Sequence, residues 1–376
     1  WASGCGRPPI PIEDKSKGAS TAPSEPPPGR ESAGEAGARS GPRTPLLSVR
    51  NLKTYFAQDE GTVKAVDGVN LDLYPGATLG IVGESGCGKS VTARSILRIV
   101  DRPGRIVEGE IQFRRPAANG EPGVTVDLAR LDSNGSEMRS IRGAEIALIF
   151  QEPMSSFSPV HTVGNQIIEA ILLHQKLSRR EARDRAIDML KRVGVSSPEE
   201  RVDQLSNQLS GGLRQRAMIA MALSCHPTLL IADEPTTALD VTTQTQILEL
   251  MRRLQREDGM AIMLITHDLG VVAEMATDVA VMYLGRVVEQ APVDAIFHAP
   301  RHPYTRALLR SIPRMRSRSR ERLTPIAGAV PHPYDRPTGC PFHPRCAEFM
   351  AGRCDREAPV LKSVGDRHAV SCFLYE

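Results

Sequence analysis

Residues 83–90 read GESGCGKS, a complete GxxxxGKS phosphate loop, and this stretch decides the fold. It lies between the strand-like run TLGIVG (78–83) and the helix-like run SVTARSILRIV (90–100), which is the context that the motif requires. Glycines let backbone N–H groups turn inward around phosphate oxygens, and the following helix presents its positive N-terminal end to the same anion. The sequence therefore predicts a nucleoside-triphosphate site formed by Gly83, Glu84, Ser85, Gly86, Cys87, Gly88, Lys89 and Ser90.

Two residues of this loop carry charge and metal contacts. Lys89 is expected to reach the β- and γ-phosphates, and Ser90 is expected to bind Mg²⁺. A glycine-rich turn with a purely structural role is the alternative. It does not explain why the loop ends in Lys-Ser with a strand before it and a helix after it, so we favour the nucleotide site.

Composition bounds the possible functions. The 376 residues are 40% hydrophobic, which is enough for a globular core. Lys and Arg number 47 against 44 Asp and Glu, and this balance gives no general support for nucleic-acid binding. The longest apolar runs, such as those at 217–223 and 260–265, are much shorter than the roughly 20 residues that span a bilayer.

The chain divides by composition into three parts. Residues 1–44 are dominated by Gly, Pro, Ser and Ala, and they predict a disordered leader because they cannot bury enough apolar surface to fold. Residues 45–290 alternate strand-like and helix-like runs around the phosphate loop. Within them, residues 114–145 are rich in Gly, Pro, Asn and Asp and predict a surface insertion before the buried strand EIALIF (145–150). Residues 291–376 predict a separate C-terminal module.

Helical patterns dominate from about residue 160 to 215, which predicts a helical subdomain. The run SRREARDRAIDMLKRVG begins with a capping box at Ser178 and Glu181, and its Gly194 suits a helix exit. The alternation of strands and helices then returns, with a hairpin expected to turn at Gly285. Such alternation predicts a largely parallel sheet with helices on both faces.

Five further motifs follow the phosphate loop in a fixed order. They are Gln151 at a strand end, LSGGLRQR (209–216), LLIADEP (229–235), TALD (237–240) and THD (266–268). In identity, order and context this set resembles the ATP-binding subunit of an ABC transporter over about residues 46–290. The resemblance implies an α/β fold: a P-loop ABC ATPase core with a mixed sheet flanked by helices, a helical subdomain, and a small Cys-rich C-terminal module.

The acidic pair Asp233-Glu234 ends an apolar strand, where a carboxylate is placed to hold magnesium and its neighbour points to the attacking water. We expect Asp233, Ser90 and Gln151 at the Mg²⁺ and Glu234 as the general base. A helix-capping role for the acidic pair is the weaker alternative. The resemblance also implies that His267 contacts the γ-phosphate and orders the water, and that Gln151 couples the magnesium site to a membrane partner.

The run LSGGLRQR is similar to the ABC signature, in which Ser210, Gly211 and Gly212 contact ATP bound to the opposite subunit. Leu213 stands where the common signature has Gln, which removes one amide and leaves the helix terminus intact. Asp240 matches the loop that crosses the dimer interface. An aromatic residue should stack on adenine, and spacing favours Phe56 over its neighbour Tyr55.

Four cysteines lie in the last part of the chain, separated by five, seven and seventeen residues: Cys340, Cys346, Cys354 and Cys372. Four soft ligands in a short tail suggest a metal, and disulfides are disfavoured if the protein works in the reducing cytosol. The intervals do not fit a paired CxxC ribbon, and four thiolates hold zinc or an iron–sulfur cluster equally well. Cys87 and Cys225 are not expected to be ligands.

This tail, with HPYTRALLRSIP (302–313) before it, is similar to the C-terminal region of ATPase subunits from oligopeptide and dipeptide importers. That resemblance implies a 4Fe-4S cluster on the four cysteines, with zinc as the second candidate and unliganded thiols as the bland one. The basic run over 310–322 predicts a solvated linker, because no aromatic residues interleave with its arginines.

The resemblance implies an ATPase that powers peptide uptake from the cytoplasmic face of the cell membrane, as a peripheral subunit. Its implied partners are two membrane permease subunits, a second homologous ATPase chain or a second copy of this one, and, indirectly, an external peptide-binding protein. An ABC ATPase acting on ribosomes or DNA is a different class, favoured by two cassettes in one chain or by an inserted coiled coil. Neither feature is present, so no nucleic-acid partner is expected. A nucleic-acid-binding zinc tail has only the basic run in its favour.

Overall fold

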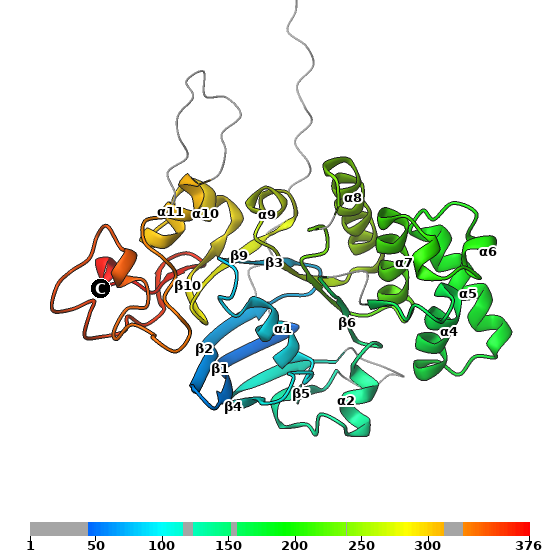
Figure 1. Ribbon diagram of the computed structural model, residues 1–376, viewed down its shortest axis with the longest axis horizontal. Coiled ribbons are helices and arrows are strands. Elements are labelled where there is room, and N and C mark those ends of the chain that lie inside the picture. The colour runs from blue at the N-terminus through cyan, green and yellow to red at the C-terminus, as the bar shows by residue number, and fades with distance from the viewer. Residues whose placement is uncertain (1–43, 116–122, 152–155, 238, 312–325) are drawn as a thin grey trace, which may run out of the picture. The chain divides into compact units, whose positions relative to one another are not determined.

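The computed structural model describes residues 44–115, 123–151, 156–237, 239–311 and 326–376, and these form two sheets with helices around them (Figure 1). The leader expected over residues 1–44 lies outside the described residues, apart from Thr44. Most of the basic run over 310–322 also lies outside them.

The main sheet has the strand order β11-β12-β10-β9-β3-β8-β7-β6. Its centre, from β9 to β6, is parallel, and β10, β12 and β11 are antiparallel additions at one edge. Its strands are β3 (Thr78–Val82), β6 (Ile146–Ile149), β7 (Leu229–Asp233), β8 (Ala261–Ile265), β9 (Asp278–Tyr283), β10 (Arg286–Pro292), β11 (Lys362–Gly365) and β12 (His368–Val370).

The second sheet is antiparallel, with the order β2-β1-β4-β5. Its long strands come from β-branched and aliphatic residues at alternate positions, whose buried side faces helix α1 (Lys89–Ile96). Its members are β1 (Leu47–Gln58), β2 (Gly61–Leu73), β4 (Gly104–Arg114) and β5 (Thr125–Asp127).

Helices cover both faces of the main sheet, as the alternation of strands and helices predicts. Figure 1 shows α8 and α9 on one side of the sheet and α1 on the other. The alternating side chains of β8 follow this division: Ile262 and Leu264 pack in one apolar cluster, and Met263 and Ile265 in the other. The remaining helices are α2 (Ser136–Ile141), α4 (Val163–His174), α5 (Arg179–Arg192), α6 (Pro198–Arg201), α7 (Gly211–Leu223), α8 (Val241–Asp258), α9 (Leu269–Met275), α10 (Val293–His298) and α11 (Pro303–Arg310), with 3₁₀ turns at Leu128–Arg130, Ser206–Gln208, His343–Arg345 and Phe373–Tyr375.

Two local predictions are confirmed. Helix α5 begins with the full capping box, in which the Ser178 side chain accepts from the Glu181 N–H and the Glu181 carboxylate accepts from the Ser178 N–H. Strands β9 and β10 form an antiparallel hairpin, and Gly285 in its turn has a φ of 76°, which favours glycine.

The prediction of a surface insertion over 114–145 is wrong from about residue 125 onward. This stretch contains β5 and α2, and Leu128, Met138 and Ile141 are completely buried against the second sheet and its neighbours. The insertion therefore contributes to the core as well as to the surface.

The structure does not support the separate Cys-rich module expected after residue 290. Strand β12 pairs with β10, which adds the end of the chain to the main sheet. Residues 340–354, which contain three of the four tail cysteines, are called the cysteine segment. Phe342 of this segment packs with Tyr283 of β9 and Tyr304 of α11 in one buried aromatic cluster. The tail is thus part of the same compact unit, residues 43–376, as the rest of the described chain.

Candidate functional site

The phosphate loop joins the end of β3 to the start of α1. A side chain at Gly83 would place its Cβ 2.2 Å from the carbonyl oxygen of Met282, and one at Gly88 would meet the carbonyl oxygen of Ala65 at the same distance. Both residues also have positive φ, so only glycine fits. Ser85 and Gly86 are exposed at the tip, while Cys87 is buried, and burial raises the pKa of its thiol.

Lys89 lies inside this loop. Its ammonium group donates to the carbonyl oxygens of Gly83 at 2.9 Å and Glu84 at 3.1 Å, and the residue is only 6% exposed. The α1 helix has no acidic residue in its first turn, so its N-terminal end carries no competing negative charge. The loop thus concentrates positive charge beside its backbone N–H groups, which is what a polyphosphate requires.

The side chains of Ser90, at the start of α1, and Asp233, at the end of β7, are in direct contact. The Ser90 hydroxyl donates to Asp233 Oδ1 at 3.0 Å, and Asp233 is buried at the end of β7. Burial raises the pKa of Asp233 most, the Ser90 hydrogen bond opposes the shift, and the charge of Glu234 adds to it. A hydroxyl beside a carboxylate is a ligand pair that suits Mg²⁺.

Gln151, Glu234 and His267 are brought together around one carboxylate. Gln151 Nε2 donates to Glu234 Oε2 at 3.0 Å, and His267 Nδ1 lies 3.3 Å from Glu234 Oε1. Thr237, which the sequence did not single out, donates from its hydroxyl to Glu234 Oε2 at 2.9 Å. Glu234 has a left-handed φ of 48°, an uncommon conformation for a residue with a side chain. The motif contained Thr237, but nothing in the pattern indicated its partner.

The signature residues open helix α7. Ser210 is its N-cap and accepts from the Leu213 N–H, and a Cβ at Gly211 would meet nothing within 4 Å. Within the described part of the chain, no hydrogen bond links Ser210, Gly211 or Gly212 to the phosphate loop. A further contact was not foreseen: the buried Gln215 Nε2 donates to the Pro235 carbonyl oxygen at 2.5 Å, which ties α7 to the residue after Glu234.

Asp240 is the exposed N-cap of α8. Its carboxylate accepts from the backbone N–H and the hydroxyl of Thr243, and these bonds lower its pKa. Of the two aromatic candidates for adenine, Tyr55 donates its hydroxyl to Asp67 at 2.7 Å, and burial with that bond raises its pKa to about 12. Phe56 is half-buried over Gly104 at the start of β4, without a polar anchor.

The four tail cysteines lie near one another but are not arranged as a metal site. The pKa of Cys340 is raised to about 11, first by burial and then by the charges of Cys354, Cys372 and Cys346. The Cys340 N–H also donates to the Cys354 carbonyl oxygen at 2.8 Å. Even so, among the described residues no group of three or more His, Cys, Asp or Glu side chains has the geometry to hold a metal.

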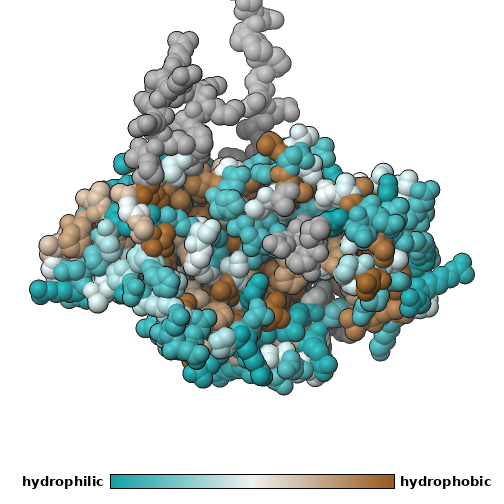
Figure 2. Space-filling view, in the orientation of Figure 1, coloured by the Kyte–Doolittle hydropathy of each residue, from teal (hydrophilic) through white to brown (hydrophobic). Residues whose placement is uncertain are grey.

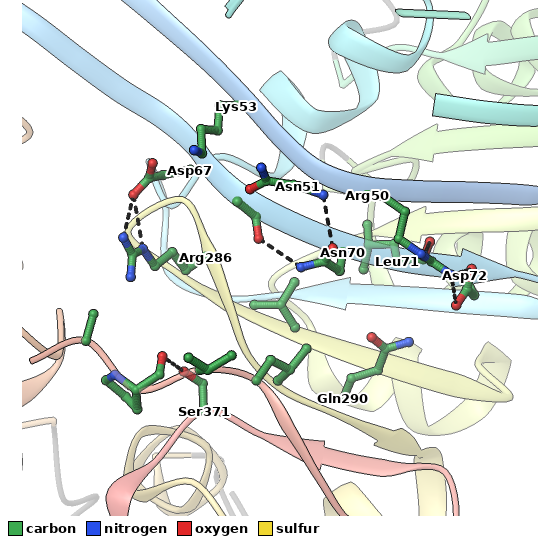
Figure 3. Close-up of a pocket in the computed structure, with 16 residues that line it drawn as sticks. Arg50, Asn51, Lys53, Asp67, Asn70, Leu71, Asp72, Arg286, Gln290 and Ser371 are labelled. Atoms are coloured by element: carbon green, nitrogen blue, oxygen red, sulfur yellow. Dashed lines mark hydrogen bonds and ion pairs between the residues drawn. The ribbon is translucent and has the colours of Figure 1, made fainter. Parts of the chain in front are cut away.

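A cavity of about 680 Å³ lies elsewhere, between β1, β2, β10 and the C-terminal segment (Figure 3). It contains none of the site residues expected from the sequence. Two ion pairs lie within its wall, Arg286 with Asp67 at 2.8 Å and Arg50 with Asp72 at 2.7 Å, and a further lining residue, Lys53, pairs with Glu108 outside it. The chemistry of the motifs therefore does not lie in this cavity.

Known protein families match both the region around the phosphate loop and the C-terminal region. The model of the ABC transporter family matches residues 66–237, and the model of the oligopeptide/dipeptide transporter C-terminal region matches 288–354. A peptide import ATP-binding protein of Brucella melitensis is 49% identical over 89% of this chain and 98% of its own length. The dipeptide transport ATP-binding protein DppD of Escherichia coli is 48% identical over 87% of this chain and 96% of its own.

A solved structure extends the comparison to the fold. The ATP-binding cassette MJ0796, determined as a dimer in a post-hydrolysis state with ADP and phosphate, has a TM-score of 0.56 and 27% identity to this chain. The match covers 66% of this chain and 99% of the cassette. Among the residues that the structure describes, no helix has both the length and the apolar character needed to cross a membrane.

Proposed function

Because this chain belongs to the ATP-binding subunits of the ABC transporters that import peptides, we propose that it hydrolyses ATP on the phosphate loop to drive peptide uptake. One observation carries the assignment of the catalytic centre. The Glu234 carboxylate, next to the buried Asp233 at the end of β7, is held by Gln151 and lies within 3.3 Å of His267.

The residues present fit MgATP. Lys89 would neutralise the β- and γ-phosphates, and the N–H groups of Gly86, Gly88 and Lys89 would face them. The oxygens of Ser90 and Asp233 would hold Mg²⁺, with Gln151 as a further ligand. Phe56 would stack on adenine. Bound MgATP supplies the phosphoanhydride bond that is broken.

Glu234 would then act as the general base. It accepts a proton from water as the water oxygen bonds to the γ-phosphorus and the bond to the β-phosphate oxygen breaks, which gives ADP and phosphate. The contacts from Gln151, Thr237 and His267 fix the Glu234 carboxylate before the reaction, so it need not reorganise. His267, more than half exposed, would contact the γ-phosphate and order the water.

A second chain would complete each site. Ser210, Gly211 and Gly212 form an accessible helix N-terminus that suits an anion, and Asp240 lies exposed at the start of α8. We propose that these residues face the triphosphate bound to a partner ATPase chain, either a homologue or a second copy. The related cassette MJ0796 was itself determined as a dimer.

Membrane permease subunits are the other proposed partners. Val160, Leu172 and Leu173 are exposed around α4, at 76%, 36% and 73%, and Figure 2 shows apolar surface over the helical region on the right of the view. Such a patch suits contact with a permease at the cytoplasmic face of the membrane. Affinity purification from native membranes should recover permease subunits; recovery of ribosomes or DNA instead would contradict this function.

We also propose that Cys340, Cys346, Cys354 and Cys372 bind a 4Fe-4S cluster. The support is that the thiols lie close together in a partly buried segment. The pKa values of Cys340, Cys346 and Cys372 are raised first by burial, and the charges of neighbouring tail cysteines raise them further. The side chains would have to draw closer than they do here. Protein purified without oxygen should contain four iron atoms and four acid-labile sulfides for each chain. Colourless protein with stoichiometric zinc would contradict the cluster.

The catalytic assignment is tested by two substitutions. Lys89→Ala should lose MgATP binding and hydrolysis together, because the phosphates lose their buried cation. Glu234→Gln should bind MgATP normally and hydrolyse it at least about a hundredfold more slowly, since general-base catalysis contributes about 10²–10⁴ in rate. Steady-state phosphate release and equilibrium nucleotide binding measure the two effects.

The matched control is Glu274→Gln, which removes a carboxylate from a surface ion pair with Arg252 and should leave both measurements unchanged. Phosphate release by the Glu234→Gln protein at the rate of the natural chain would remove Glu234 from its role.

A further inference from the structure

Glu84, the second residue of the phosphate loop, is held at all three of its polar groups. Its N–H donates to the Tyr304 hydroxyl at 3.0 Å, and its carbonyl oxygen accepts from Lys89 at 3.1 Å. Its carboxylate accepts from both terminal nitrogens of Arg345, at 2.7 Å and 3.0 Å. Two of these three partners come from the C-terminal region, far from the loop in sequence.

Burial and further contacts hold the Arg345 side chain in place. Its side chain is only 4% exposed, its Nε donates to the Ala327 carbonyl oxygen at 3.1 Å, and its guanidinium lies 5.8 Å from the centre of the Tyr283 ring. Glu84 is the sole carboxylate among the partners found for this guanidinium within the described residues. A bidentate pair of this kind fixes direction as well as distance.

Arg345 belongs to the cysteine segment. Arg345 lies between Cys340 and Cys346, and Phe342 packs its ring 5.3 Å from those of both Tyr283 and Tyr304. Tyr304 is completely buried in α11. The cysteine segment, α11 and the end of β9 therefore pack against one another and contact the phosphate loop through Glu84.

We propose that Arg345 and Tyr304 are positioning residues that hold Glu84, so that the cysteine segment sets the affinity of the phosphate loop for MgATP. The inference rests on the proposed function only in that this loop binds MgATP. Lys89 bonds to the Glu84 carbonyl oxygen, so displacement of Glu84 moves an anchor of the cation that faces the phosphates.

The test uses the full chain and the non-hydrolysable analogue MgAMP-PNP, with binding measured by equilibrium titration. Arg345→Ala should weaken binding about tenfold, as expected for loss of a charge-assisted bidentate pair. Arg345→Lys keeps the charge without the fork and should give an intermediate loss. The matched control is Arg367→Ala, which breaks another ion pair of the tail, to Asp278 of β9, without touching the loop, and its affinity should stay within about twofold.

A double-substitution cycle separates positioning from general loss of structure. Glu84→Ala should weaken binding, and adding Arg345→Ala should weaken it no further, because the pair acts as a unit. Equal affinities for Arg345→Ala and Arg367→Ala, or full additivity with Glu84→Ala, would overturn the proposal. If Arg345→Ala does not fold, Arg345→Lys and Glu84→Gln decide by the same comparison.

The failure of this proposal can be told apart from failure of the function. The natural chain should bind MgAMP-PNP and Lys89→Ala should not. If the natural chain binds and Arg345→Ala binds equally well, the positioning role alone is wrong.

Discussion

At the scale of single residues, the run His302-Pro303-Tyr304 forms the start of α11 and links it to the phosphate loop. The His302 Nδ1 accepts from the Tyr304 N–H and caps α11, Pro303 occupies the first helical turn, where its missing N–H costs nothing, and Tyr304 reaches the phosphate loop. His302 is completely buried, and burial lowers its pKa to about 3. The cap therefore works only while the imidazole is neutral.

This predicts an acid sensitivity. The folded chain keeps His302 neutral down to about pH 3, whereas the unfolded chain binds a proton below about 6.5, so the free energy of unfolding falls as pH drops through that window. Between pH 6.5 and 5 the loss from this residue is about 2 kcal/mol. Urea unfolding of the natural chain and of His302→Asn, which keeps a cap acceptor, measures it. Parallel pH dependences for the two proteins would refute the assignment.

The sequence identified most residues of the candidate site because the motifs are local. Lys89, Ser90, Asp233 and Glu234 each lie at a strand end or helix start that periodicity reveals. The contacts of Glu84 could not be found in this way. Its partners lie 220 and 261 positions away, and they meet it only because the chain returns to the main sheet after α11.

At the scale of elements, side-chain caps define where four of the helices begin. Thr162, Ser178, Ser210 and Asp240 each accept from a backbone N–H in the first turn of α4, α5, α7 and α8. Residues such as these are visible in sequence, which is why α5 could be predicted to its cap. The short β5 and α2 could not, because three to six residues are too few to display a period and their burial comes from distant strands.

The capping box of α5 gives a prediction about stability. Ser178→Ala removes the acceptor for the Glu181 N–H and should lower the free energy of unfolding by about 1 kcal/mol. Because α5 carries no candidate catalytic residue, ATP hydrolysis at low temperature should be unchanged. Chemical unfolding measures the cost, with the exposed Ser196→Ala as control. A loss equal to that of the control would show that the cap contributes nothing.

At the scale of the whole molecule, the residues proposed to bind and hydrolyse ATP lie on different elements from the residues proposed to contact the partner's ATP. Lys89 and Glu234 belong to the loops of the main sheet, whereas Ser210 opens α7 in the helical region, and within the described chain no hydrogen bond joins them. A Cβ added at Gly211 would meet nothing within 4 Å, so this helix end is open on the side of Gly211. Under the proposed function, a lone chain would therefore hold half of each catalytic site.

The rate of hydrolysis should therefore depend on assembly. Phosphate released per chain should rise with protein concentration and then level off as paired chains saturate. Ser210→Arg should bind MgATP like the natural chain and lose this rise, because the bulky cation blocks the helix end from the partner. A rate per chain that is constant down to dilutions at which light scattering detects monomers alone would contradict a site shared by two copies of this chain.

The strands that close the chain have a consequence for how the tail can be studied. Deletion of everything after residue 290 would remove β12 from its pairing with β10 and leave an open sheet edge, which promotes aggregation. It would also strand the fully buried Glu289 carboxylate, which accepts a hydrogen bond from the His302 N–H and lies 2.7 Å from His368 Nε2. A shortened protein would thus fail by precipitation, whatever the cysteines do, and single replacements are the cleaner probe of this region.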